Sequence, residues 1–269
     1  MTTEVTAPVL DPLFTAEDTD RFTDRHIAAL AAGTSAAVRI PAMLTPDACT
    51  AALTALDRLP VGEYDPQRVP TRILRFGPAL NDHRMPDGTL AAARYWHAAD
   101  TARRSWAAAA LRPDPVAVAL GALGTAWGAA VLPATIDGRP VFGGTVREIR
   151  DGALVHCDEV VREYPRPVFD QPVIAQLAFN LWVAAPESGG ETTIWRRRWQ
   201  PSDEAHRDAY GYHPSVVGDA QSVTLRPGLG DALLFNPANM HAVAPSAGRR
   251  VAFAFFLGLT TTGQLIAWS

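Results

Sequence analysis

Lysine is absent from this chain of 269 residues, and cysteine is almost absent. All 24 basic residues are therefore arginine, which we interpret as the coding bias of a GC-rich genome, so an isolated arginine is weak evidence of a special role. The two cysteines, Cys49 and Cys157, are too few for a disulfide framework and are typical of a protein in the reducing cytosol. The first residues lack the basic start and apolar run of a signal peptide, and no uninterrupted apolar stretch has membrane-spanning length. We expect a cytoplasmic protein without a membrane partner.

An excess of positive charge is also lacking. The formal net charge is −4, so the chain offers no basic field for nucleic acid, and we expect no nucleic-acid partner. A hydrophobic content of 48% in a chain of this length is enough to bury a substantial core. Because no internal repeat or low-complexity linker divides the chain, we expect one domain that spans residues 1–269.

The first part of the chain, residues 1–130, is predicted to be mainly helical. Thr45-Pro46-Asp47 has the composition of a helix start, with a hydroxyl N-cap, proline at the first helical position and an acid in the first turn. Two alanine-rich segments are separated by a pair of prolines, which interrupt a helix. The predicted helices are 18–32, 45–58, 89–111 and 114–128, and a short strand is predicted at 35–40.

The second part, residues 131–269, has the pattern of a β structure. Short runs rich in Val, Ile, Phe and Trp are separated by Gly, Pro and Asp, and Asp137-Gly138 and Asp151-Gly152 are hairpin-type turn dipeptides. The predicted strands are 142–150, 153–158, 173–184, 191–196, 221–226, 231–236, 249–259 and 263–268. The pattern favours a sandwich or barrel, so the fold class is α+β with a mainly β core and an N-terminal helical support.

The triplet His156-Cys157-Asp158 and the later His241 form a candidate metal site. In a strand, residues i and i+2 point to the same face, so His156 and Asp158 can bind one metal while Cys157 faces away. His241 must then come from a second strand alongside. Two histidines and one carboxylate with open positions are the protein ligands of non-heme Fe(II) oxygenases.

The candidate ligands and several other segments of the chain resemble those of the Fe(II)- and 2-oxoglutarate-dependent dioxygenases. The matching pieces are the His156-Cys-Asp158 motif, Gly190-Glu-Thr, the run 227–235, and His241 followed by two arginines. No single piece is specific, but their order and spacing together are. The resemblance implies a double-stranded β-helix, or jelly roll, with Fe(II) on His156, Asp158 and His241. It also implies 2-oxoglutarate as cosubstrate, O2 as oxidant and hydroxylation of an unactivated C–H.

The resemblance places a basic residue for the distal carboxylate of 2-oxoglutarate shortly after His241. If 249–257 is a strand, Arg250 shares a face with two alanines and Arg249 shares one with bulky side chains. A barrel interior must leave room for the cosubstrate, so we expect Arg250 to bind it and Arg249 to lie at the rim. Asn180 and Thr192 are predicted to point into the same barrel and to hydrogen-bond the cosubstrate.

The predicted substrate is a small anionic or zwitterionic molecule, specifically a free or N-modified amino acid in view of the relatives that this region resembles. Arginines near the predicted barrel mouth, Arg75, Arg162 and Arg196, are the candidate substrate-binding residues. The same cofactors also support desaturation, cyclisation or a natural-product substrate. Two other classes stay open at this point, a zinc-dependent hydrolase and a non-catalytic jelly-roll binding protein. Related halogenases have a small residue in place of the carboxylate, so Asp158 favours hydroxylation.

Overall fold

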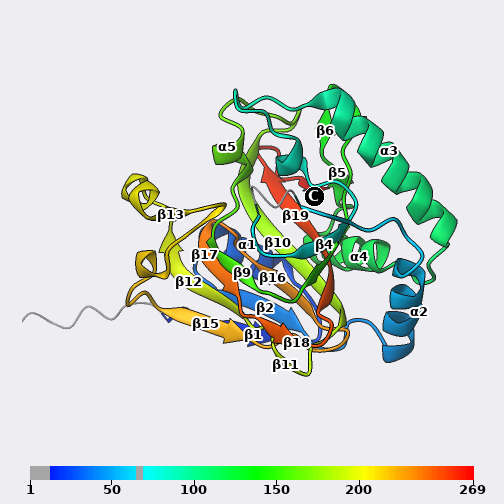
Figure 1. Cartoon of the computed structure of the whole chain (residues 1–269), viewed down its shortest axis with the longest axis horizontal. Coiled ribbons are helices and arrows are strands. Elements are labelled where there is room, and N and C mark those ends of the chain that lie inside the picture. The colour runs from blue at the N-terminus through cyan, green and yellow to red at the C-terminus, as the bar shows by residue number, and fades with distance from the viewer. Residues whose placement is uncertain (1–12, 65–68) are drawn as a thin grey trace, which may run out of the picture.

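The computed structural model describes residues 13–64 and 69–269, and its centre is a pair of facing sheets (Figure 1). Among the described residues, ten strands form the large sheet. In spatial order they are β1 (Ala16–Asp18), β2 (Ala37–Ile40), β16 (Ala232–Phe235), β10 (Val173–Ala184), β19 (Val251–Thr260), β8 (Thr145–Ile149), β4 (Ile73–Phe76) and β3 (Gly62–Glu63), with β20 (Leu265–Trp268) beside β19 and β5 (Leu132–Pro133) beside β20.

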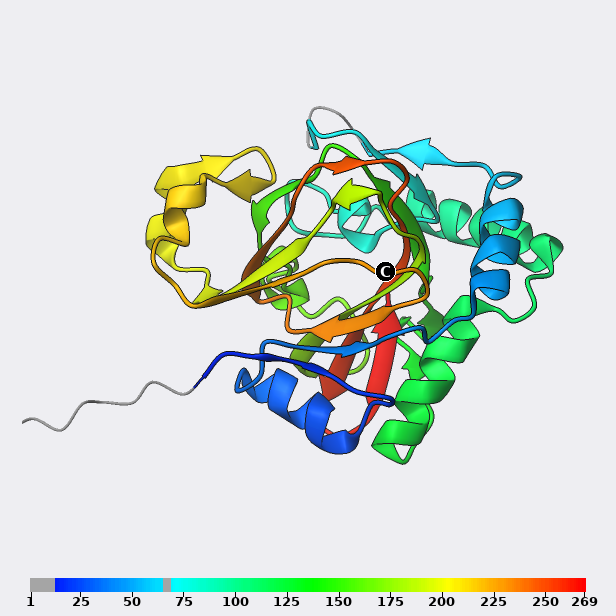
Figure 2. The same ribbon diagram turned by 90° about the horizontal axis from the view of Figure 1, so that it is seen from below.

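The smaller sheet faces the large one and contributes the other wall of the interior. Its strands, in spatial order, are β13 (Arg207–Asp208), β14 (Gly211–Tyr212), β9 (Ala153–His156), β17 (Asn239–Val243), β12 (Thr192–Arg198) and β15 (Ser222–Leu225). Two short pairs complete the β structure, β11 (Ser188–Gly189) with β18 (Ser246–Ala247) and β6 (Thr135–Ile136) with β7 (Arg139–Pro140). Seen from below, the strands curve around a common interior and the helices lie outside it (Figure 2). The predicted jelly roll is confirmed.

The helices begin where their capping residues predict. Thr45 caps the helix that starts at Pro46, and Asp114 accepts hydrogen bonds from the first amides of the helix that starts at Pro115. The helices are α1 (Asp24–Ala32), α2 (Pro46–Leu56), α3 (Ala92–Ala109), α4 (Pro115–Trp127) and the short α5 (Val160–Glu163), with 3₁₀ turns η1 (Leu80–His83), η2 (Pro201–His206) and η3 (Pro214–Val216). None of the helices in the described part of the chain has the length and apolarity needed to cross a membrane.

The main hydrophobic core lies between the large sheet and the helices. Alternate side chains of β10 face this core and the interior cavity. Leu177, Phe179 and Leu181 are buried in this core, and α1 and α2 pack against their strand. Ala178 and Asn180, one position away, line the interior cavity instead. One face of β10 therefore stabilises the fold, and the other faces the cavity.

The predicted elements are found near their predicted bounds, but several short strands were not predicted. Asp18, the predicted first residue of a helix, instead ends β1, which pairs in parallel with β2, and the helix begins at Asp24. The strand β17 was not predicted as an element, although a second strand was expected to carry His241. The first 130 residues supply α1 to α4 and also β1 to β4, which extend the large sheet on both sides. The single domain over 1–269 stays a prediction, and its first 12 residues lie outside the described part.

Candidate metal and cosubstrate site

Three side chains from two adjacent strands of the smaller sheet meet at one end of the interior. His156 is the last residue of β9, and it lies directly opposite His241 of β17 in the antiparallel register. Asp158 follows two residues later, where its amide donates to the Pro237 carbonyl at 2.9 Å and holds the chain as it leaves the strand. Cys157 lies between them and packs instead against a separate hydrophobic cluster. His156 and Asp158 therefore face one site as predicted, although β9 ends at His156 and Asp158 lies just beyond the strand.

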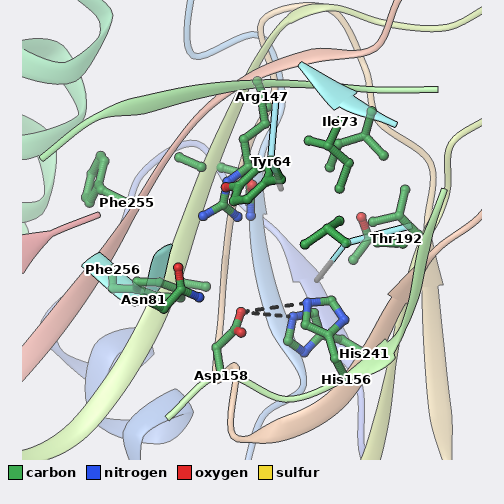
Figure 3. A pocket seen from close by; sticks show the side chains of 18 of the residues that line it. Tyr64, Ile73, Asn81, Arg147, His156, Asp158, Thr192, His241, Phe255 and Phe256 are labelled. Atoms are coloured by element: carbon green, nitrogen blue, oxygen red, sulfur yellow. Dashed lines mark ion pairs between the residues drawn. The ribbon is translucent and has the colours of Figure 1, made fainter. Parts of the chain in front are cut away.

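The side chains of these three residues converge on one point (Figure 3). The Oδ2 atom of Asp158 lies 3.8 Å from Nε2 of His156 and 3.7 Å from Nε2 of His241. Bonds of about 2.1 Å from nitrogen or oxygen to a first-row metal span up to about 4.2 Å between two donors. Both Asp158–histidine distances lie within this span, and all three ligand atoms lie within 4.8 Å of one another, so these residues could hold one ion.

Hydrogen bonds behind the histidines set their tautomers for this task. Nδ1 of His156 lies 2.7 Å from the Leu154 carbonyl, and Nδ1 of His241 lies 2.9 Å from the Asn239 carbonyl. A carbonyl only accepts, so each Nδ1 carries the proton and donates it. Each Nε2 is then an unprotonated donor atom that faces Asp158. This arrangement, with the second ring nitrogen held by the backbone, is typical of metal-ligating histidines.

Burial and charge keep His156 and Asp158 in the protonation states that a metal requires. Burial, together with the neighbouring His241, lowers the pKa of His156 to about 4. Burial alone would raise the pKa of Asp158, but the two histidines and Arg147 outweigh it and hold that pKa below its ordinary value. At neutral pH the site therefore presents a neutral His156 imidazole and a carboxylate, so the residues fit a divalent ion.

Arg250 lies deep in the same interior and is only 3% exposed. Its Nε donates to the Gly190 carbonyl at 2.9 Å and its Nη2 donates to Oγ1 of Thr192 at 3.1 Å. In the part of the chain that the structure describes, no ion pair involves this guanidinium, and burial lowers its pKa to about 10. A buried charge without an opposite charge is costly, so this position favours an anionic ligand.

A cavity of about 140 Å³ joins Arg250 to the three metal-ligand candidates. Ala252 and Ala254 of β19 leave room in it, as the strand-face argument predicted, and Asn180 and Thr192 also line it. Arg249 points out of the barrel, where its guanidinium binds Glu148 and Asp57. The structure thus brings all six predicted metal- and cosubstrate-binding residues to one cavity: His156, Asp158, His241, Arg250, Asn180 and Thr192.

The three predicted substrate-binding arginines have different positions. Arg162 lines a second cavity of about 470 Å³, which we call the vestibule and which shares Asn81, His156, Asp158 and Tyr210 with the first. Arg75 forms an ion pair with Asp82 at 2.5 Å, and Asp82 lines the inner cavity. Arg196 is exposed on β12, bonds Gln221 and lines neither cavity.

Several wall residues were not predicted from the sequence: Tyr64, Asn81, Arg147 and Tyr210. Arg147 had a weak local signal, because it is a charged residue in the middle of a predicted strand, where Glu148 beside it is charged as well. In a chain whose basic residues are all arginine, that signal did not distinguish it.

A jelly roll with a His-x-Asp…His site at one end of its interior and a buried arginine deeper in the barrel defines a class, the Fe(II)- and 2-oxoglutarate-dependent dioxygenases. Residues 127–268 match the family model described as carrier-protein-independent halogenase WelO5, and the chain belongs to this family. It is 51% identical over 258 residues to the L-gamma-glutamyl-L-propargylglycine hydroxylase of Streptantibioticus cattleyicolor, covering 95% of this chain and 96% of that one. The enzyme is an Fe(II)/2-oxoglutarate-dependent hydroxylase. This excludes the two alternative classes, a zinc-dependent hydrolase and a non-catalytic binding protein.

Two further comparisons agree. The chain is 33% identical over 132 residues to leucinostatins biosynthesis cluster protein S of Purpureocillium lilacinum, which covers 45% of this chain and 53% of that protein. The crystal structure of an N-substituted L-amino acid dioxygenase with alpha-KG, from Burkholderia ambifaria, superposes with a TM-score of 0.63. It is 18% identical and the match covers 91% of this chain and 90% of that one, so the likeness supports the fold.

Asp158→Gly is expected to abolish hydroxylation and to leave weakened Fe(II) binding on His156 and His241. The substitution removes one of three ligands and its negative charge, so metal affinity should fall at least about 100-fold, since even groups behind the ligands are worth 10–100-fold. Anaerobic titration with Fe(II) and an assay for hydroxylated product measure the two effects. Full hydroxylase activity in this variant would show that Asp158 is not a ligand.

Proposed function

We propose that this enzyme hydroxylates an unactivated C–H of a small N-modified amino acid, of the γ-glutamyl type for which its 51%-identical relative is named. In this proposal His156, Asp158 and His241 hold Fe(II), and Arg250 with Thr192 receives the distal carboxylate of 2-oxoglutarate. One observation supports the proposed substrate class. The metal-ligand candidates lie where the inner cavity meets the vestibule, which is lined by acidic and basic side chains.

Bound Fe(II) and 2-oxoglutarate supply the oxidising power, since the cosubstrate is decarboxylated to succinate as O2 is consumed. The chain's own residues hold the target C–H near the metal site and keep bulk water away. The apolar side chains of Ile73, Ile149 and Phe256 contribute walls of the inner cavity. The charged side chains of Glu159 and Arg162 line the vestibule.

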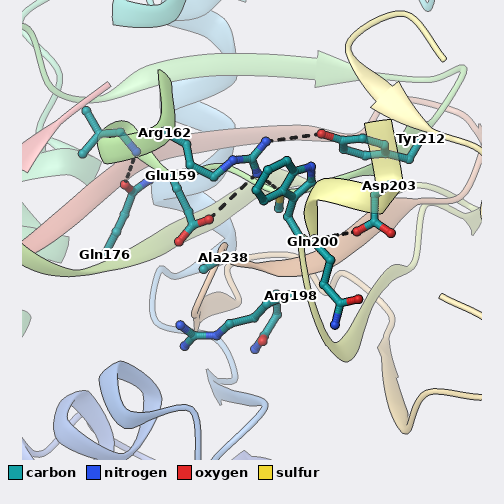
Figure 4. Close-up of polar contacts among 12 residues, drawn as sticks. Glu159, Arg162, Gln176, Arg198, Gln200, Asp203, Tyr212 and Ala238 are labelled. Carbon is teal, nitrogen blue, oxygen red and sulfur yellow. Dashed lines mark hydrogen bonds and ion pairs between the residues drawn. The ribbon is translucent and has the colours of Figure 1, made fainter. Parts of the chain in front are cut away.

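The vestibule matches a zwitterion because its charges come in closely spaced opposite pairs (Figure 4). Arg162 lies 3.9 Å above the ring of Trp199 and donates to the Tyr212 hydroxyl at 3.3 Å, while its Nη1 is 3.9 Å from the Glu159 carboxylate. A glutamyl group carries an ammonium and a carboxylate on one carbon. Glu159 can receive the ammonium, and Arg162 can bind the carboxylate.

The proposal predicts which compounds stimulate the enzyme. L-γ-glutamyl-L-propargylglycine should increase succinate formation strongly above the uncoupled rate, and free L-propargylglycine should do so much less because it lacks the glutamyl zwitterion. Coupled succinate detection with mass spectrometry of the organic product measures both. If only uncharged lipids or protein side chains stimulated turnover, the proposed substrate class would be wrong.

Arg162→Gln should raise the KM for the γ-glutamyl substrate about 10- to 100-fold and leave uncoupled 2-oxoglutarate turnover near that of the wild type. The expected loss is of the order of 1.5–3 kcal/mol, the usual contribution of a hydrogen bond to a charged group. Arg196→Gln is the matched comparison, since it removes the same charge from an exposed position outside both cavities. Equal effects of the two changes on KM would refute a specific role for Arg162.

A further inference from the structure

Arg147 lies in the wall of the inner cavity and points towards the metal site, with Tyr64 beside it (Figure 3). It is the central residue of β8, directly opposite Ala252 of β19 and Arg75 of β4. Residues directly opposite in a sheet share a face, and Ala252 lines the cavity, so the register directs Arg147 inward. It is a second arginine in the cavity besides Arg250.

In the described part of the chain, two carboxylates act on Arg147, those of Asp82 and Asp158, and each has another partner. Asp82 is the ion-pair partner of Arg75, and Asp158 faces the two histidines at 3.8 and 3.7 Å. The Tyr64 hydroxyl accepts a hydrogen bond from Arg147. The Nε of Arg147 is buried, and within residues 13–64 and 69–269 it has no hydrogen-bond partner. Buried N–H donors are nearly always satisfied, so this one indicates a ligand position.

A carboxylate fits this position best. The guanidinium presents its donors in a plane, and a carboxylate accepts two of them in parallel with a charge-assisted gain. Nε is one donor of that fork, it is unpartnered among the described residues, and the Arg147 side chain lines the cavity. The cosubstrate's distal carboxylate is assigned to Arg250, which leaves the carboxylate of the substrate for Arg147.

We propose that Arg147, supported by Tyr64, binds the carboxylate of the amino-acid unit that is hydroxylated, an assignment that rests on the function proposed above. The glutamyl zwitterion occupies the vestibule near Arg162, and the second residue of the dipeptide enters the inner cavity. Its carboxylate is then fixed on Arg147 in the same chamber as His156 and Asp158. With both ends held, the side-chain carbons between them are presented to the metal site, so Arg147 is a determinant of which C–H reacts.

The test compares two ligands that differ only at this group. L-γ-Glutamyl-L-propargylglycine and its C-terminal carboxamide are titrated anaerobically into the enzyme loaded with Fe(II) and 2-oxoglutarate, and Kd is measured by calorimetry. The wild type should prefer the acid by about 30- to 1,000-fold, as expected for a desolvated charge pair. Arg147→Gln should bind both ligands equally weakly, and Arg147→Lys should recover part of the preference because it keeps the charge and loses the fork.

Two controls separate this role from a structural one. Arg72→Gln removes the same charge from an exposed position on the adjoining segment, where Arg72 binds Glu63, and should leave the preference unchanged. The Kd of 2-oxoglutarate and the melting temperature of Arg147→Gln should stay close to the wild type.

Each contrary result has its own meaning. If Arg147→Gln kept the preference for the acid, or lost affinity for 2-oxoglutarate instead, the assignment of Arg147 would be overturned while the proposed substrate class stood. If the wild type neither bound nor hydroxylated the dipeptide, both the substrate class and this assignment would be overturned.

Discussion

Replacing His241 by alanine is expected to abolish hydroxylation and to weaken Fe(II) binding by at least about 100-fold, while the jelly roll stays intact. His241 supplies one of the three convergent ligand atoms, and its Nε2 faces Asp158 at 3.7 Å. Without it, His156 and Asp158 hold the ion by two bonds, and the remaining positions no longer have a fixed orientation. His156→Ala should have the same effect, because the two rings occupy equivalent places in the register.

Fe(II) titration under anaerobic conditions, succinate formation and circular dichroism measure binding, turnover and folding separately. His213→Ala is the matched control, since His213 is exposed and its ring bonds the neighbouring Ser215. Normal turnover in His241→Ala would contradict the metal assignment. If His241→Ala does not fold, the same measurements are made on His241→Gln. This variant keeps a polar side chain of similar size and should bind Fe(II) as poorly.

Arg250→Ala is expected to raise the 2-oxoglutarate concentration needed for half-maximal turnover tens- to thousands-fold, and Arg249→Ala should change it little. Arg250 is buried, donates to a carbonyl and a hydroxyl, and has no ion pair within the described residues, so its charge favours an anion. Losing such a pair in a partly dry cavity costs about 2–5 kcal/mol. Arg249 is already paired with Glu148 and Asp57 outside the barrel.

The comparison is made by steady-state kinetics at saturating substrate and by direct 2-oxoglutarate titration. Arg250→Lys should retain part of the affinity, because it keeps the charge but loses the planar fork. Small and equal effects of Arg249→Ala and Arg250→Ala would refute the assignment of Arg250 to the cosubstrate.

Local periodicity was sufficient to predict the orientation of Arg250. Residues 251–260 form the regular strand β19, and Arg250 directly precedes it. Alternate residues of a strand face opposite sides, so Arg250 faces inward with Ala252 and Ala254, away from the bulky side chains. The same rule predicted that His156 and Asp158 share a face. These inferences needed no knowledge of any other strand.

The strand that carries His241 could not be recognised in this way. Residues 239–243 form β17, but Pro237 precedes them, Pro245 follows them, and Asn239 has a low strand propensity. Their extended conformation is fixed by pairing with β9 and β12 on either side, which are far away in the sequence. Tertiary contacts outweigh local preference in this segment.

The orientation of the Arg147 side chain also depends on how distant strands pair. Whether its side chain faces the cavity is settled by its pairing with Ala252 and Arg75, which come from distant parts of the chain. A shift of one residue would have turned it outward, and no local pattern fixes that shift. The substrate-binding arginines were predicted from their positions along the sequence. Strand pairing, which the sequence does not show, decides which residues line the cavity.

The family takes its description from a halogenase, whereas this chain keeps a carboxylate at Asp158 and the 51%-identical relative is named a hydroxylase. One measurement tests this account most directly. Purified enzyme is supplied with Fe(II), 2-oxoglutarate, L-γ-glutamyl-L-propargylglycine and labelled O2 in the presence of chloride, and the products are analysed by mass spectrometry. The account predicts one labelled oxygen in the dipeptide, one succinate formed per product molecule and no chlorinated dipeptide. A chlorinated product, or succinate formation that the dipeptide does not stimulate, would contradict it.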